Sequence, residues 1–313
     1  MVSLLILSFA SVWAGDRSFV RPEEPLSADR PGSADTNKPD PGEKVPPKTG
    51  NGGKPGRGGK GEGKGKGKGK MDKDPWTGPF KKKGYPTELI RRPLTLPKGM
   101  GEVSAGFGLV SVDTGSSSSS ATGLGMAGRY GFTDDISAGV ATGFALSPNA
   151  AWSEGAILSG DYLAVDGKGT DLALGLDLGL GFASGASQSV TFDVATRIRA
   201  SDMVWFEVGE NALTVLIPGG GGDAVGSLAA ILGVGVQATD SVAVTLHTLL
   251  FTAPLFPSTA GATWLGDFIP VTLTGTFTPA SLPELDVVLS LGTLDLVHAT
   301  QVITFGLGAA YRF

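Results

Sequence analysis

Hydrophobic residues alternate with small or polar residues along the C-terminal two thirds of the chain, from about residue 100 to residue 313. In the clearest stretch, residues 171–182, every even position is leucine or phenylalanine and every odd position is glycine, alanine or aspartate. Residues 303–313 repeat this pattern. A period of two places one kind of side chain on each face of a β-strand. The pattern therefore predicts an all-β domain.

We predict about twelve strands, within a range of 10–14. They cover residues 102–112, 122–132, 135–146, 155–165, 171–182, 188–199, 203–216, 226–237, 241–251, 265–277, 285–294 and 301–313. Tight turns such as residues 132–135 and 238–241 alternate with longer loops such as residues 114–121 and 253–264. This alternation is typical of antiparallel strands that run up and down around a transmembrane barrel.

Alternation alone also fits a water-soluble barrel or sandwich, so the charge content decides between them. Residues 101–313 hold 24 charged residues among 213, well below the roughly 25% that is usual in soluble domains. The strand face opposite the leucines and valines is mostly glycine, alanine, serine and threonine, which would solvate a soluble exterior poorly. We therefore expect the apolar face to contact lipid and the small face to line a lumen.

Tryptophans give a second indication of membrane placement. Trp76, Trp152, Trp205 and Trp264 lie near predicted strand ends or in connections. Aromatic side chains are enriched at both membrane–water interfaces, so we expect these four to lie there.

The first hundred residues have a different composition. They carry 20 Lys/Arg and 11 Asp/Glu, whereas residues 101–313 carry 5 and 19, which gives net charges of +9 and −14. Residues 1–14 contain a short apolar run followed by small residues, which is typical of a secretory signal peptide, although no lysine or arginine precedes the run. Residues 15–87 lack hydrophobic periodicity and include a Gly/Lys repeat, so we expect a disordered basic tail. Pro93 and Pro97 then predict an extended lead-in to a barrel that covers residues 88–313.

Motifs for catalysis and for metal binding are missing from the sequence. The chain has no cysteine and only two histidines, which excludes thiolate chemistry and a multi-histidine metal centre. No serine lies two positions after His247, as a phospholipase pair in a barrel would require, so we expect His247 to line the pore or lie at an interface. The glycine run at residues 219–222 lacks the Lys-Ser/Thr ending of a phosphate-binding loop. We therefore predict no enzyme activity, no cofactor and no metal site.

The lumen is the surface on which function should depend. If the apolar faces contact lipid, eight charged side chains are candidates to line a pore. They are Asp161, Asp177, Asp193, Arg197, Arg199, Glu207, Asp286 and Arg312. Most other inward positions are small and leave space for water, an excess of acids favours cations, and opposing arginines would narrow the path. The sequence predicts a passive diffusion channel with a modest cation preference; the alternative is that these ions form pairs that only stabilise the barrel.

The end of the chain resembles the C-terminal signature of outer-membrane β-barrel proteins of Gram-negative bacteria. Its matching positions are Phe305, Leu307, Ala309, Tyr311 and Phe313. Residues 92–97 and 130–136 are similar to uncharacterised porin-like members of that class. The resemblance, which covers residues 88–313, implies an integral protein of the bacterial outer membrane, surrounded by its lipid and recognised by the barrel-assembly machinery. It does not fix a substrate.

The basic tail suggests a second function class. Both ends of an even-stranded barrel lie on the periplasmic side, so the resemblance places the tail in the periplasm. There the tail would contact an anionic polymer such as peptidoglycan or lipopolysaccharide, or fold back as a plug against the acidic lumen. We expect no nucleic-acid partner, because the tail lacks interleaved aromatics for base stacking. The alternative function is thus a structural or anchoring barrel of the cell envelope.

Overall fold

The computed structural model describes residues 84–113, 118–147, 150–152, 155–167, 169–182, 186–209, 212–256, 263–264, 269–293, 296 and 302–313. The predicted signal peptide and residues 15–83 of the predicted tail lie outside these ranges. No helix in the described part of the chain is long and apolar enough to cross a membrane.

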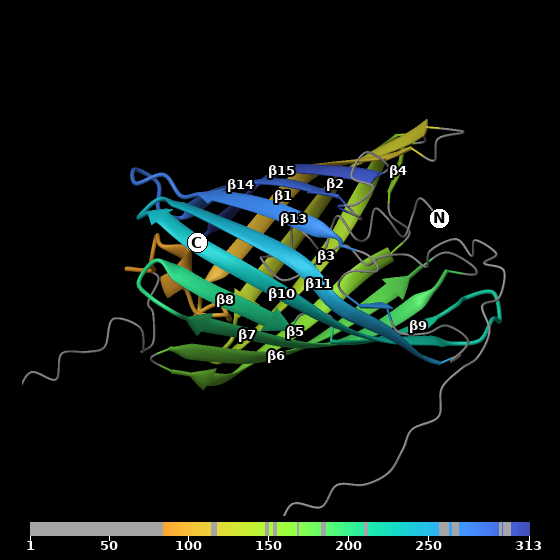
Figure 1. Ribbon diagram of the computed structural model, residues 1–313, viewed down its shortest axis with the longest axis horizontal. Helices are drawn as coiled ribbons and strands as arrows, with labels where there is room; N and C mark the ends of the chain where they lie inside the picture. Colours follow the sequence, from red (N-terminus) through yellow and green to blue (C-terminus); the bar gives the residue numbers. More distant parts are fainter. Residues whose placement is uncertain are drawn as a thin grey trace, which may run out of the picture. The chain divides into compact units, whose positions relative to one another are not determined.

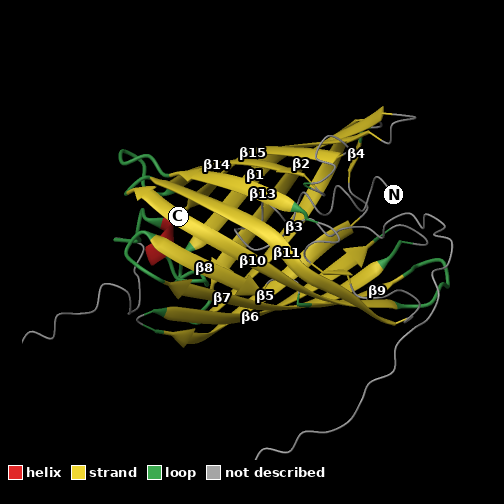
Figure 2. Ribbon diagram, in the orientation of Figure 1, coloured by secondary structure: helices red, strands yellow, loops and turns green. Residues whose placement is uncertain are grey.

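In the described part of the chain, fifteen strands form one antiparallel sheet (Figures 1 and 2). They are β1 (Gly101–Asp113), β2 (Ser118–Gly131), β3 (Ile136–Ser147), β4 (Ala151–Trp152), β5 (Gly155–Asp166), β6 (Thr170–Gly181), β7 (Gln188–Arg199), β8 (Val204–Gly209), β9 (Leu213–Ile217), β10 (Val225–Thr239), β11 (Val242–Phe256), β12 (Thr263–Trp264), β13 (Val271–Phe277), β14 (Leu285–Thr293) and β15 (Val302–Arg312).

Three of these strands share a place in the wall with a neighbour in the chain. β8 and β9 both pair with β7 and β10, β4 and β5 both pair with β3, and β12 and β13 both pair with β11. The wall therefore has twelve strand positions.

The sheet closes on itself, because β1 pairs with β15 along its length. Glu102 lies opposite Arg312, and Val112 lies opposite Val302. Beyond the last strand, the amide of Gly101 donates to the Phe313 carbonyl at 2.9 Å and the amide of Phe313 donates to the Gly101 carbonyl at 2.8 Å. Closure pairs the edge strands that an open sheet would leave exposed. This pairing satisfies their backbone amides and carbonyls, for which lipid offers no hydrogen-bond partner. The predicted antiparallel barrel of twelve strands is confirmed.

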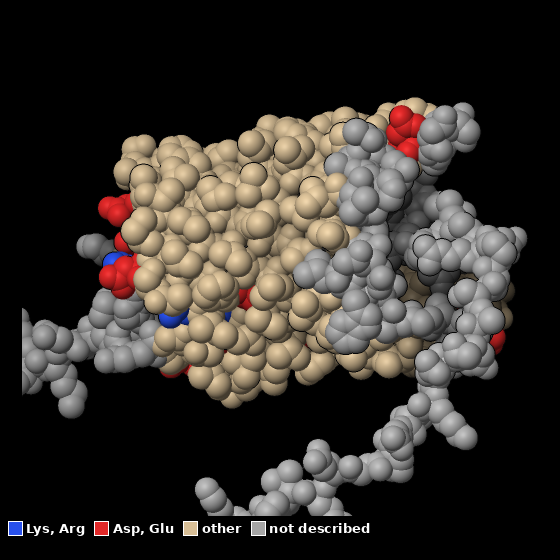
Figure 3. Space-filling model, viewed as in Figure 1, with Lys and Arg blue, Asp and Glu red and all other residues tan. Residues whose placement is uncertain are grey.

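Side chains alternate between the two faces of the wall as the sequence predicts. On β6, Leu176 is 47% exposed, whereas its inward neighbours Asp171 and Ala173 are buried. The face of the barrel in Figure 3 is mostly uncharged along its length, and most of the charged residues that it shows lie towards the two ends. The exposed charged residues of the described chain all lie in turns, loops or the last positions of strands. An apolar outer wall with charges confined to both ends is the surface that a membrane-spanning barrel presents to lipid.

The two ends of the barrel differ in their connections. Short turns at residues 132–135, 167–169, 200–203 and 240–241 lie at one end, which also carries the β13–β14 connection, Gly101 and Phe313. We call this the turn end. Most of the longer connections lie at the opposite end, which we call the loop end. The predicted alternation holds except that the β13–β14 connection, residues 278–284, is longer than the β1–β2 connection, residues 114–117.

Two predicted strands and the lead-in differ in detail from the structure. The strand expected over residues 203–216 is interrupted after Gly209, whose φ of +119° suits glycine alone, and resumes as β9. The strand expected from residue 265 begins at Val271, directly after a proline that has no amide to donate. The lead-in that we expected to be extended contains one 3₁₀ turn, η1 (Leu89–Arg91).

Candidate solute pathway in the barrel lumen

Residues 84–100, here called the N-terminal segment, lie across the opening at the turn end (Figure 1, orange). Leu89 and Ile90 of η1 pack inside the wall against Trp205 of β8 and Ala243 of β11. Ile90 is completely buried. Burial of two aliphatic side chains of this size stabilises the seated segment by about 1.5–3 kcal/mol each.

Arginines of β7 bind the backbone of η1. Arg197 donates through Nη1 to the carbonyls of Leu89 and Arg92, at 3.1 Å each, and Arg199 donates through Nε to the carbonyl of Ile90 at 2.9 Å. On β10, Gln237 accepts a hydrogen bond from the amide of Ile90 at 3.3 Å. The Leu89 carbonyl also accepts from the Arg92 amide at 3.2 Å, but the Ile90 carbonyl has no such donor because residue 93 is a proline. Arg199 therefore satisfies a carbonyl that would otherwise be buried unpaired.

A second anchor joins the N-terminal segment to β14 and β15. Asp286 accepts bidentate hydrogen bonds from Arg92 (2.6 and 3.0 Å) and from Arg312 (2.6 and 3.0 Å), and all three side chains are buried. Thr278 donates to Asp286 at 2.6 Å and accepts from Arg92 at 2.9 Å. The ring of Tyr85 lies 5.7 Å from the Arg92 guanidinium and 5.1 Å from that of Arg312. Burial raises the pKa of the Tyr85 phenol, against the opposing effect of the two arginines. The phenol therefore stays neutral at physiological pH.

The other end of the N-terminal segment is held by the β2–β3 turn. Thr95 donates to the Asp134 carbonyl at 3.3 Å, and the Lys98 amide donates to the Asp134 carboxylate at 3.2 Å. A Cβ at Gly131 would collide with backbone carbonyls of the segment, so glycine is needed for this close approach. With contacts on β7, β10, β14 and this turn, the segment narrows the turn-end opening.

Glu207 is the centre of a polar cluster on the inner wall. It accepts hydrogen bonds from Arg197 Nη2 at 2.9 Å and from Trp205 Nε1 at 2.8 Å, and its Oε2 lies 2.9 Å from His247 Nε2. Trp205 is completely buried, so its predicted place at the membrane interface is wrong. The residues on both sides of Trp205 point outward, which turns its indole into the lumen, where Gly235 leaves room for the ring.

The remaining predicted site residues form pairs or an acidic group. Asp161 accepts from Arg129 at 3.1 Å and from Ser137 at 3.2 Å. Arg199 forms an ion pair with Asp171. Asp161 and Asp193 both lie opposite Gly175, one on each neighbouring strand, and Asp177 lies two residues closer to the loop end. Asp161, Asp177 and Asp193 thus share one area of the inner wall, which we call the acidic patch.

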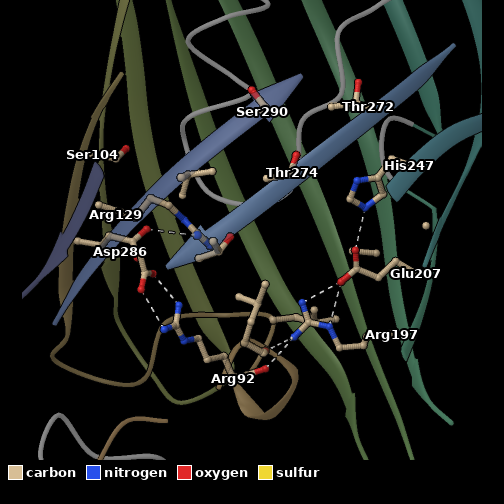
Figure 4. Close-up of a pocket in the computed structure, with 18 of the residues that line it drawn as sticks. Arg92, Ser104, Arg129, Arg197, Glu207, His247, Thr272, Thr274, Asp286 and Ser290 are labelled. Carbon is tan, nitrogen blue, oxygen red and sulfur yellow. Dashed lines mark hydrogen bonds and ion pairs between the residues drawn. The ribbon is translucent and has the colours of Figure 1, made fainter. Parts of the chain in front are cut away.

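A cavity of about 180 Å³ lies inside the barrel next to the N-terminal segment (Figure 4). Pro93, Leu94 and Leu96 of the segment line it on one side. Strands β1, β13, β14 and β15 line it with Ser104, Thr272, Thr274, Thr276, Ser290 and Thr304. Of the eight charged residues predicted to line a pore, Arg197, Glu207, Asp286 and Arg312 line this cavity; of the predicted C-terminal signature, Phe305 and Ala309 contribute to its lining. No group of three or more described His, Cys, Asp or Glu side chains is arranged to hold a metal ion.

Several residues of this site were not predicted. Asp171 and Arg129 lie on the small-residue face of their strands in the sequence pattern, so the alternation contained a signal for both. Glu102 and Trp205 lie next to the first residues of β1 and β8, so only an alternation extended to the strand ends would place them on the inner face. Nothing in the local sequence indicates that Arg92 reaches Asp286, from which 194 positions separate it.

Comparisons with known proteins match folds only. No protein-family model matches the chain, and no curated protein matches its sequence. Among solved structures, the chain is similar to the KdgM porin, with 9% identity and a TM-score of 0.45 over 67% of this chain and 99% of that one. It is similar to the NanC porin, with 9% identity and a TM-score of 0.47 over 67% and 98% of the two chains. It is also similar to an outer-membrane channel from Pseudomonas putida F1, with 12% identity and a TM-score of 0.47 over 70% and 97%.

Proposed function

We propose that this protein is a porin-like channel of the bacterial outer membrane, through which small solutes diffuse passively. The observation that carries the proposal is a cavity of about 180 Å³, lined by charged and hydroxyl side chains among apolar ones, inside a closed barrel whose outer wall is apolar. A barrel of this size with small inward side chains leaves space for water, and polar groups along that space lower the barrier for polar solutes.

Single-channel recording of refolded protein in a planar bilayer tests this proposal. We expect stable current steps of one size in KCl, together with a gel mobility that differs between boiled and unboiled samples. Folded protein, recognised by that mobility difference, that gives no current would contradict the channel.

The channel should prefer cations, because acids outnumber arginines on the inner wall. Within the described strands, seven acids lie there against four arginines. The acids are Glu102, Asp161, Asp171, Asp177, Asp193, Glu207 and Asp286; the arginines are Arg129, Arg197, Arg199 and Arg312. The preference should depend on the acidic patch, because its three carboxylates lie closer to the loop end than the ion pairs of Glu207 and Asp286.

The double variant Asp177→Asn/Asp193→Asn is expected to reduce the cation-to-anion permeability ratio by about half, since two of the carboxylates that attract cations are neutralised. The reversal potential in a KCl gradient measures this ratio. Asp223 and Asp240 lie in exposed connections outside the lumen. The matched variant Asp223→Asn/Asp240→Asn should therefore leave the ratio unchanged, and equal ratios in the two double variants would argue against the role of the acidic patch.

Placement and assembly follow the same proposal. The turn end would face the periplasm, with the basic tail continuing from residue 84, and the loop end would face outward. Leu307 and Tyr311 are exposed on the outer wall, and Phe313 lies at the seam between β1 and β15, which is accessible to an assembly factor. Recognition of these residues by the barrel-assembly machinery, and contact of the tail with peptidoglycan or lipopolysaccharide, remain predictions.

A structural or anchoring barrel is the second candidate. The N-terminal segment contacts four parts of the wall, and this observation favours the second candidate. A segment held by so many contacts is able to close the lumen completely rather than only narrow it. Such a barrel would give no current until the segment is removed, which separates the two candidates.

A further inference from the structure

We propose that the cavity is a binding site for a small, uncharged, polyhydroxylated solute such as a monosaccharide, and that Thr272, Thr274, Ser290 and Thr304 are the residues that recognise it. The inference rests on the proposed channel function and names the solute class that the channel would favour.

Four hydroxyl groups lie together on three neighbouring strands. Thr274 of β13 lies opposite Ser290 of β14, and Gly292 of β14 lies between Thr272 of β13 and Thr304 of β15. A Cβ at Gly292 would be 2.7 Å from both threonine hydroxyls, so these two hydroxyls converge above the glycine. Figure 4 shows Thr272, Thr274 and Ser290 along one wall of the cavity. We call these four residues the hydroxyl wall.

The hydroxyl wall has unused hydrogen-bonding capacity. Within the described chain, no side chain or backbone group forms a hydrogen bond with the hydroxyls of these four residues, and none of them is sealed away from the cavity. A serine or threonine hydroxyl both donates and accepts, so it exchanges hydrogen bonds with water or with another hydroxyl equally well. The wall is therefore a row of neutral groups suited to a solute that also donates and accepts.

Charged groups around the cavity are already engaged. Arg197 binds Glu207 at 2.9 Å, and Asp286 binds both Arg92 and Arg312 at 2.6 Å. A charged solute would have to compete with these buried bidentate pairs, whereas an uncharged solute leaves them intact.

Size and spacing fit one sugar ring. The cavity has room for several water molecules, which a bound solute would displace. Neighbouring strands lie about 4.8 Å apart, so hydroxyls on adjacent strands are separated by a distance similar to that across a six-membered ring. Pro93, Leu94 and Leu96 supply an apolar surface for the C–H groups of such a ring.

Solute flux into liposomes that contain the full refolded chain tests the inference. The double variant Thr272→Val/Thr274→Val removes two hydroxyls at nearly constant volume. We expect it to lower glucose flux at low concentration by about tenfold, since two hydrogen bonds are lost. Flux of triethylene glycol, which has few hydroxyls, and KCl conductance should change less than twofold.

Two further variants control for structure. Thr191→Val/Thr214→Val removes the same number of lumen-wall hydroxyls, but these two bind each other at 3.2 Å and lie outside the cavity, so glucose flux should stay unchanged. Thr272→Ser/Thr274→Ser keeps the hydroxyls and should keep the flux. If the valine variant fails to fold, competition in the wild-type protein decides: mannitol should inhibit glucose flux and triethylene glycol should not.

Four results would overturn the inference. Three are equal glucose flux in the Thr272→Val/Thr274→Val and Thr191→Val/Thr214→Val variants, loss of glucose flux in the serine variant, and wild-type glucose flux that mannitol does not inhibit. The fourth is a barrel that conducts KCl and excludes glucose, which would overturn this inference alone. A barrel that passes neither would overturn the proposed channel as well.

Discussion

Replacing Asp286 by alanine is expected to lower the free energy of unfolding of the barrel by about 3–5 kcal/mol. Asp286 is 5% exposed and binds Arg92 and Arg312 with both carboxylate oxygens. Its removal leaves two buried guanidinium groups without their main partner. The N-terminal segment would also lose the ion pair that joins it to β14.

Urea titration of the refolded protein in lipid vesicles, followed by tryptophan fluorescence, measures this loss of stability. Asp240 lies exposed in a tight turn, so Asp240→Ala serves as the control and should change the free energy by no more than about 0.5 kcal/mol. A loss in Asp286→Ala no larger than that of the control would show that the buried ion pairs do not stabilise the barrel.

Deleting residues 84–96 is expected to raise the single-channel conductance severalfold. These residues fill the turn-end opening and form one side of the cavity. The wall should tolerate their loss, because each arginine that now binds the segment keeps an acid on the wall. Arg197 retains Glu207, Arg199 retains Asp171, and Arg312 retains Asp286.

A deletion of equal length in the predicted basic tail, residues 51–63, is the control, and we expect it to leave the conductance unchanged. If the variant that lacks residues 84–96 conducts and the wild-type protein does not, the result would favour the structural candidate, in which the segment closes the barrel. Equal current through the wild-type and the 84–96 deletion would mean that the segment lies outside the conducting path.

Most of the barrel was predictable because each wall residue has only two possible surroundings. Lipid requires large apolar groups and the lumen accepts small ones, so positions such as Leu176 and Gly175 identify their face without knowledge of the rest of the fold. The same rule placed Arg197, Glu207 and Asp286 inside, and the structure shows them there.

The N-terminal segment was not predictable in the same way. It has no repeating pattern, and its contacts depend on distant residues: Arg92 binds Asp286, and Arg197 reaches Leu89 across 108 positions. Sequence reasoning identified the prolines of the segment but had no means of showing that the chain turns into the lumen. The interruption at Gly209 was missed for a related reason, because one unusual backbone angle does not change the alternation on either side of it.

The contacts of Asp286 join the N-terminal segment to the last two strands of the sheet. β15, the last strand of the sheet in chain order, carries Arg312, which shares one carboxylate with Arg92, a residue that precedes the first strand. The shared network is therefore complete only when β14 and β15 both lie beside the segment. Bringing together groups 194 positions apart carries a cost in chain entropy that is offset once the intervening strands are paired. We therefore expect the segment to take its final place late in folding, after the strands of the wall have paired.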